Sequence, residues 1–305
     1  MRSAPTNVAA SVQSRLLNAA RETGEDFQLL LTRFALERYL RRLGESRFMD
    51  RFVLKGAMLY PLWGGAVHRP TRDLDLHGNG DSDVTSIVEL VREVCAVKVE
   101  EDGLRFHPET VRGQEIREDQ EYEGVRIQLE CRLASARIFL QVDIGFGDVI
   151  VPDPSEVEYP ALLSFPAARI RAYSRESVIA EKYQALVALG IANSRMKDFY
   201  DLAMLARTFP FNGALLCEAI QATFRRRRTP VPLEIPMGLS DEFCDDVTKN
   251  AQWRAFLGRT RLEDGSDSLR PTVLFLRGFV VPPSNALASN QVFASHWPPG
   301  GPWGE

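Results

Sequence analysis

The chain has 305 residues, a formal net charge of −4 and a sequence pI near 5.8. This length fits one large domain or two ordinary ones, and its 45% apolar and 26% charged residues are typical of a globular protein rather than a disordered chain. A dedicated duplex-binding protein is usually basic, although a local basic cleft can still hold a polyanion. Four short basic patches occur, each more typical of a solvated face than of a binding site: Arg41-Arg42, residues 169–175, Arg195 with Lys197, and residues 225–228.

The targeting and redox signals indicate a cytoplasmic protein without a membrane partner. No apolar run is long enough to span a bilayer, and residues 1–10 lack the apolar core of a secretion signal. Acidic residues at positions 22, 25 and 26 also argue against a transit peptide. The cysteines are widely spaced and form no C-x-x-C pair, so we expect reduced, mostly buried thiols; they are Cys95, Cys131, Cys217 and Cys244.

The first half of the chain mixes helical and extended patterns. Residues 8–43 predict two helices that are interrupted at Thr23-Gly24. Residues 52–54 predict a short strand, followed by a glycine turn and a helix. A strand is expected over 73–76, a helix over 83–94, and an antiparallel hairpin over 124–133 and 138–144, where apolar residues alternate with polar ones.

The second half of the chain reads as helical. Prolines at positions 152, 154 and 160 indicate a domain boundary near 160. Helices are predicted over 174–189, 198–208, 211–228, 240–260 and 268–281. Residues 282–305 are rich in Pro, Gly, Ser and Asn, and we expect them to be disordered. The predicted fold is therefore α/β (α+β), with a core of strands and helices at 1–160, a helical lobe at 161–281 and a tail at 282–305.

Asp73-Leu74-Asp75 carries the strongest chemical signal. Because side chains alternate along a strand, both carboxylates point to one face while Leu74 and Leu76 point to the core. Two adjacent carboxylates repel each other unless a cation lies between them. Mg²⁺ is commonly held by one or two carboxylates together with substrate phosphates, which indicates phosphoryl or nucleotidyl transfer. An exposed acidic edge strand is the alternative interpretation.

Lys55-Gly56-Ala57 lies just upstream, between the predicted strand and helix. A glycine at this position lets the backbone approach a ligand closely, and the first N–H groups of the following helix can bind a phosphate. Arg72, beside the acid pair, either neutralises it or holds a phosphate oxygen. The glycine turn alone is a weak signal, since many strand-to-helix turns need glycine.

Three further polar residues stand in apolar or helical patterns. Asp143 lies on a strongly aliphatic strand and would complete a set of three carboxylates for Mg²⁺. Lys182 interrupts an apolar helical stripe, so it either extends to solvent or faces a phosphate. Asp198 is equally consistent with the N-terminal cap of a helix and with a functional acid.

These segments together resemble the AbiEii/AbiGii-type toxins, bacterial nucleotidyltransferases of the polymerase-β-like superfamily. The resemblance covers roughly residues 25–210 and rests on ordered motifs. The motifs are residues 52–57, 72–76, 142–143, 181–182 and 195–202.

The resemblance implies a bilobed fold with a mixed-sheet, polymerase-β-like nucleotidyltransferase core and a helical second lobe. It also implies a Mg²⁺-dependent enzyme that transfers a nucleotide from an NTP to the 3′ end of RNA, expected to be tRNA, in a toxin or abortive-infection pair with a cognate antitoxin. It implies that Asp73 and Asp75 hold Mg²⁺ and that Asp143 assists deprotonation of the RNA 3′-hydroxyl. Lys182 and Asp198 would contact the nucleotide and active site from the helical lobe. Lys55 and Gly56 would form the phosphate loop.

One departure concerns Ala57, where the superfamily often has Ser or Gly; the phosphate contact from a hydroxyl is then lost, although the backbone N–H remains. Two other functions stay open. A metal-dependent nuclease or another phosphotransferase would use the same acids. A non-catalytic interaction module with a decayed site is the second alternative, and retention of all three acids argues against it.

Overall fold

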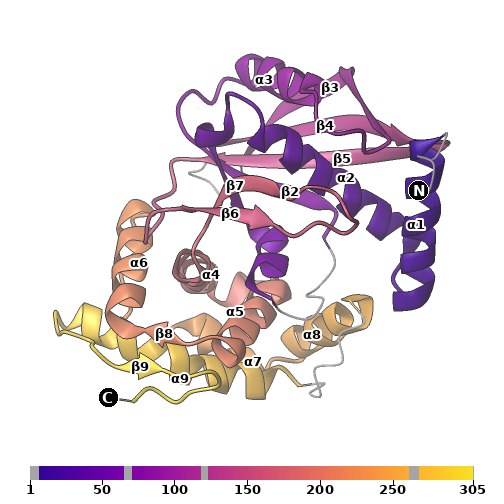
Figure 1. Ribbon diagram of the computed structural model, residues 1–305. Coiled ribbons are helices and arrows are strands. Elements are labelled where there is room, and N and C mark those ends of the chain that lie inside the picture. Colours follow the sequence, from indigo (N-terminus) through magenta and orange to yellow (C-terminus); the bar gives the residue numbers. More distant parts are fainter. Residues whose placement is uncertain (1–6, 65–70, 118–122, 261–267, 305) are drawn as a thin grey trace. The chain divides into compact units, whose positions relative to one another are not determined.

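The computed structural model describes residues 7–64, 71–117, 123–260 and 268–304 (Figure 1). The chain forms two compact units. Unit 1 comprises residues 1–147 and 155–172, and unit 2 comprises residues 148–154 and 173–305. The division therefore does not fall at a single position near 160, because the chain enters unit 2 for seven residues and then returns to unit 1.

Unit 1 is built on a seven-stranded mixed sheet with the order β3-β4-β5-β2-β1-β7-β6. β2 runs parallel to β5, β1 runs parallel to β7, and the other neighbouring pairs are antiparallel. The strands are β1 (Phe52–Lys55), β2 (Asp73–Gly78), β3 (Leu104–Arg117), β4 (Glu123–Leu133), β5 (Ala136–Phe146), β6 (Ser155–Tyr159) and β7 (Ala168–Ala172).

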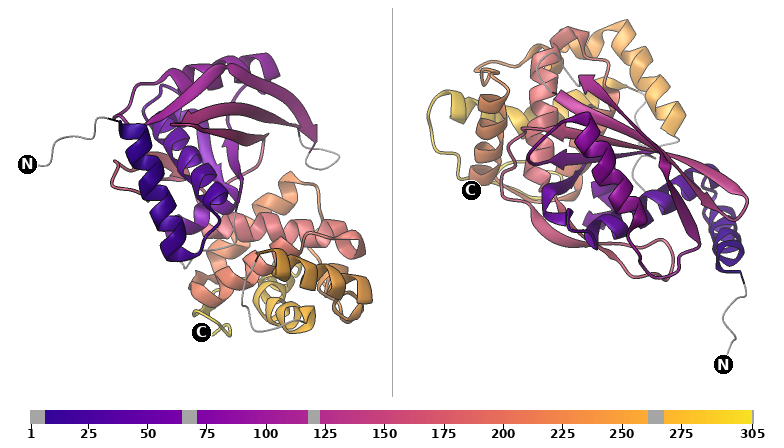
Figure 2. Two further views of the ribbon diagram at one scale, coloured as in Figure 1. Left: turned by 90° about the vertical axis from the view of Figure 1, so that its right-hand side faces the viewer. Right: turned by 90° about the horizontal axis from the view of Figure 1, so that it is seen from above.

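Helices cover the aliphatic face of this sheet (Figures 1 and 2). Leu140, Val142 and Ile144 of β5 are all buried on that face, as the alternating pattern predicts. The helices of unit 1 are α1 (Val8–Thr23), α2 (Phe27–Gly44) and α3 (Val84–Ala96), with the 3₁₀ turns η1 (Met49–Arg51) and η2 (Gly56–Trp63). The predicted break between α1 and α2 is confirmed, with Gly24 in the left-handed conformation at φ 71°.

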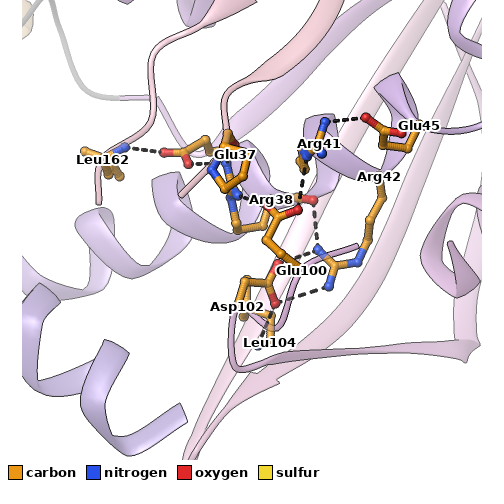
Figure 3. A network of polar contacts seen from close by, with 10 residues as sticks. Glu37, Arg38, Arg41, Arg42, Glu45, Glu100, Asp102, Leu104 and Leu162 are labelled. Carbon is orange, nitrogen blue, oxygen red and sulfur yellow. Dashed lines mark hydrogen bonds and ion pairs between the residues drawn. The ribbon is translucent and has the colours of Figure 1, made fainter. Parts of the chain in front are cut away.

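Charged side chains of α2 fix the loops that lead into the outer strands (Figure 3). Arg38 is fully buried and pairs with Glu37 at 2.8 Å and with Glu100 at 3.0 Å. Arg42 forms a bidentate pair with Asp102, at 2.7 and 3.2 Å. Arg42 of the predicted Arg41-Arg42 surface patch is therefore buried. Its ion pair joins α2 to the segment before β3.

Unit 2 is helical. Its helices are α4 (Arg175–Leu189), α5 (Met196–Thr208), α6 (Gly213–Arg226), α7 (Asp241–Asp245), α8 (Val247–Thr260) and α9 (Leu269–Ala288), with 3₁₀ turns η3 (Gly190–Ala192) and η4 (Met237–Leu239) and the small pair β8 (Phe211–Asn212) and β9 (His296–Trp297). The predicted mixed-sheet core and helical C-terminal region are thus both present. Within the described part of the chain, no helix combines the length and apolarity needed to cross a bilayer.

The prediction of a disordered tail from residue 282 is wrong. α9 continues through Pro282 and Pro283, and Trp297 is 2% exposed and packs against Phe279. The indole N–H of Trp303 donates to the Phe279 carbonyl at 2.8 Å. The buried aromatic area offsets the entropy of ordering a segment whose composition is otherwise typical of disorder.

Candidate active site

β2 and β5 bring the predicted carboxylates to one face of the sheet. Asp75 lies directly opposite Asp143 in the parallel pair, and Asp73 lies opposite Gln141. Leu74 is buried on the other face, as predicted. β2 lies between β5 and β1, so the alternative of an exposed acidic edge strand is excluded.

β1 adds the lysine and the glycine bend to the same place. Lys55 lies opposite Asp75, and a β-carbon built on Gly145 would lie 3.8 Å from Lys55 Nζ, so the amine reaches toward β5. Gly56 has φ 71°, and a β-carbon there would lie 1.9 Å from Asp75 Oδ2. Glycine is therefore required twice, by the backbone angle and by the approach of the carboxylate.

The segment after Gly56 is the 3₁₀ turn η2 rather than the expected α-helix, and Pro61 lies inside it. Ala57 is 6% exposed, so its methyl group packs into the interior. Arg72 is exposed and, with Asp73, lines a surface depression of about 770 Å³ that extends along β4 and β5. The preceding residues 65–70 lie outside the described part of the chain.

Arg126 of β4 is the polar residue of this site that the sequence analysis missed. Its Nε and Nη2 atoms donate to the two carboxylate oxygens of Asp143, both at 2.8 Å, and Gln141 Nε2 donates to Oδ2 at 3.1 Å. A signal for it exists in the sequence: counting back from the two-residue turn Ala134-Ser135 pairs Arg126 with Asp143 in the predicted hairpin.

The three carboxylates are not a ready-made metal cage. Among the residues that the structure describes, no three His, Cys, Asp or Glu side chains gather as a possible ligand set. The chemistry of the site nevertheless fits Mg²⁺. Its donors are carboxylate oxygens from two adjacent strands, and the Asp75 carboxylate packs closely against Gly56, where a β-carbon would lie 1.9 Å from Oδ2. In this arrangement Arg126 supplies the positive charge that balances Asp143.

Unit 2 holds the other predicted site residues. Lys182 Nζ on α4 lies 2.6 Å from Asp198 Oδ1 and 2.9 Å from Asp201 Oδ2, both on α5. Both acids are buried and Lys182 is 16% exposed at its side chain, so neither solvent exposure of the lysine nor N-capping by Asp198 describes them. Lys182 thus contacts two acids that lie one helical turn apart on α5.

A second buried ion pair lies nearby in unit 2. Arg227 Nη2 lies 3.0 Å from Asp148 Oδ1 and 3.6 Å from Glu181 Oε2, and its Nη1 donates to Gln184 at 2.9 Å. The pair ties residues 148–154 to α4 and α6, which explains why this short segment belongs to unit 2.

The family of this chain follows from its sequence profile. The profile described as "Nucleotidyl transferase AbiEii toxin, Type IV TA system" matches residues 38–273, from within α2 to within α9. The chain belongs to the AbiEii family of nucleotidyltransferase toxins. The match includes every site residue discussed above, so the AbiEii region covers both the carboxylates of unit 1 and the Lys182 cluster of unit 2.

Two solved structures from Helicobacter pylori are similar to this AbiEii-family chain. JHP933 has 15% sequence identity and a TM-score of 0.49, over 86% of this chain and 93% of that one. A candidate nucleotidyltransferase has 15% identity and a TM-score of 0.48, over 86% of this chain and 96% of that one. No match was found among curated proteins.

Proposed function

We propose that this AbiEii-family protein transfers a nucleoside monophosphate from an NTP to the 3′ end of RNA, with tRNA as the acceptor, and thereby blocks translation until a cognate antitoxin, encoded nearby, restrains it. The observation that supports this most directly is the register of Asp75 opposite Asp143, with Lys55 and the Gly56 bend beside them. This arrangement places acidic and basic groups together on one face of the sheet, in a chain that belongs to a nucleotidyltransferase family.

Asp73 and Asp75 would hold the metal, and Mg²⁺ would supply charge neutralisation for the phosphates of the NTP. The chain's own groups do the rest. Lys55 and the backbone N–H groups after Gly56 bind phosphate oxygens, a contact for which Ala57 supplies no hydroxyl. In the transfer, the 3′-oxygen of RNA forms a bond to the α-phosphorus, the bond to pyrophosphate breaks, and the hydroxyl proton passes to Asp143.

Both carboxylate oxygens of Asp143 already accept a hydrogen bond from Arg126, which holds the carboxylate toward β4. In the proposed reaction the ion pair opens, and the guanidinium group moves to another anion. An incoming phosphate is suitable, since arginine forms the same planar two-bond contact with phosphate as with carboxylate. Binding of substrate and release of Asp143 would then be one event.

The test is incubation of purified protein with total tRNA and each radiolabelled NTP in turn, with Mg²⁺ or with a chelator. We expect label on RNA only with Mg²⁺, and loss of label in Asp75→Ala. Asp50→Ala, an exposed acid in η1, is the matched control and should behave as wild type. Transfer by Asp75→Ala at the wild-type rate would contradict the assignment, and RNA shortening without NTP would indicate a nuclease.

A further inference from the structure

The polar face of the sheet carries an exposed aromatic ring in the first half of β5. Phe139 is 64% exposed, although its neighbours Ile138 and Leu140 are buried on the opposite face. It shares its face with Gln141 and Asp143, because these residues alternate along one strand. The guanidinium carbon of Arg137 lies 4.6 Å from the centre of its ring. Single exposed apolar residues are common, so the ring gains meaning only from its surroundings.

Those surroundings are basic, in a chain whose net charge is −4. Arg132 and Arg137 stand opposite each other on β4 and β5, and their side chains are 56% and 59% exposed. Arg105 and Arg112 extend the same face onto β3. Both are exposed. Such a group of positive charges around an aromatic ring complements a nucleic acid backbone with accessible bases.

The buried carboxylate of Glu130 holds two of these arginine side chains in place. Its side chain is 6% exposed, and its two oxygens accept from the Nε atoms of Arg132 and Arg137. The contact uses the Nε atom of each guanidinium group, and both side chains stay more than half exposed, so the terminal nitrogens can bind a phosphate. Because both side chains are held in place before binding, less conformational entropy is lost when a ligand binds.

The basic face leads to the carboxylates. The 770 Å³ depression includes Arg137 and Phe139 at one end and Arg72 and Asp73 at the other, with Gln128 between them. Phe139 is four residues before Asp143 on β5, which is about 14 Å along the strand. A strand of a few unpaired nucleotides that begins on Phe139 can therefore end beside the acids.

We propose that this face binds the unpaired 3′ end of the acceptor RNA, with a base stacked on Phe139 and phosphates held by Arg132 and Arg137. The inference rests on the proposed transferase function and assigns the acceptor to a specific surface. An open strand surface with one ring favours single-stranded RNA over a duplex, whose bases are already stacked on each other. Stacking on one ring also tolerates any base.

The test begins with binding in the absence of NTP. A fluorescent, unstructured oligoribonucleotide of about 12 nucleotides is titrated with the full-length protein, and anisotropy is measured. We expect Phe139→Ala and Phe139→Leu to weaken binding about tenfold or more, and Phe139→Trp to retain it. Leu233→Ala is the matched control, because Leu233 is 63% exposed but lies in unit 2. Arg137→Gln should also reduce the salt dependence of binding.

Kinetics then separates the acceptor from the donor. Phe139→Ala should raise KM for RNA and leave KM for NTP unchanged. Wild-type binding by both Phe139→Ala and Phe139→Leu would overturn the inference, as would an increase of KM for NTP alone. If wild type labels RNA but Phe139 proves irrelevant, the surface is wrong and the function stands. If wild type labels nothing but binds the oligonucleotide through Phe139, the surface stands and the transferase proposal fails.

Discussion

Arg126 and Asp143 form a two-bond ion pair across the β4–β5 hairpin, with both contacts at 2.8 Å. In this pair, the positive charge of Arg126 balances the negative charge of Asp143, the third acid of the candidate site. Its side chains are 34% and 11% exposed, so water screens it only in part.

We expect Arg126→Gln to bind Mg²⁺ about fivefold more tightly than wild type, because Asp143 is then released from a pair worth ~1 kcal/mol. Titration calorimetry with Mg²⁺ measures this directly. Arg47→Gln removes an equally charged residue whose partner is Glu93 on α3, and should leave Mg²⁺ affinity unchanged. Unchanged affinity in Arg126→Gln would show that Asp143 takes no part in metal binding.

Gly56→Ala tests the bend beside Asp75. The substitution places a methyl group 1.9 Å from the Asp75 carboxylate and strains a backbone at φ 71°. Gly80→Ala imposes a similar strain at φ 87° with nothing within 4 Å, so it is a matched control. Both variants should lose about 1 kcal/mol of unfolding free energy or more, but only Gly56→Ala should lose nucleotide transfer. Equal transfer rates in the two variants would count against a site at Gly56.

Lys182→Met should destabilise the protein by about 3–5 kcal/mol, because the buried carboxylates of Asp198 and Asp201 then lose the positive charge of Lys182. Chemical unfolding followed by tryptophan fluorescence reports on this change. Lys197→Met, an exposed lysine in the first turn of α5, is the control and should be near neutral.

Lys182→Arg preserves the charge and separates stability from chemistry. If stability returns but transfer does not, the lysine acts on the nucleotide as well as on the two acids. If both return, pairing within unit 2 is its whole role. A Lys182→Met protein as stable as wild type would contradict the buried cluster itself.

The lowered pKa of Glu130 predicts that the stability of the protein depends on pH. Burial alone would raise the pKa of Glu130, but the bonds from Arg137 and Arg132 lower that pKa below its ordinary value of 4.5. The unfolded state therefore takes up a proton first as the pH falls, so the stabilisation is present above pH 4.5 and is lost through the folded pKa. Glu130→Gln should have a lower urea midpoint at neutral pH, and its deficit should narrow at about pH 4. A deficit independent of pH would exclude an ionic contribution.

Trp297→Ala tests the ordered C-terminal segment. The ring is 2% exposed and its N–H donates to the Ala206 carbonyl at 2.7 Å. We expect a loss of about 3–5 kcal/mol in unfolding free energy. Val292→Ala, at a residue 91% exposed in the same segment, should change it by less than about 0.5 kcal/mol. Equal stability of the two variants would indicate that the segment does not pack in solution.

The elements with strong periodicity could be predicted from the sequence. Alternation placed the β4–β5 hairpin and put Asp143 on the face opposite the aliphatic residues, and the capping residue Ser174 marked the start of α4. Such patterns depend only on residues that are close in the sequence, so they can be recognised without knowledge of the fold.

The missed features depend on residues that are distant in the chain. β6 lies among prolines and forms because β7 offers it a partner. α9 tolerates Pro282 and Pro283 because packing in unit 2 compensates for the backbone bonds that proline removes. The partnership of Lys182 with Asp201 needs two helices side by side, which no local pattern reveals.

The position of β1 inside the sheet, between β2 and β7, constrains how this protein is made. β1 pairs with β2 at residues 73–78 and also with β7 at residues 168–172. During synthesis, β7 leaves the ribosome more than a hundred residues after β1. A nascent chain that ends near residue 147 exposes one edge of β1 and cannot close the sheet that carries Lys55. Any expression fragment intended to isolate the acidic face must therefore extend through residue 172, and it then unavoidably includes residues 148–154, whose partners lie in the other unit.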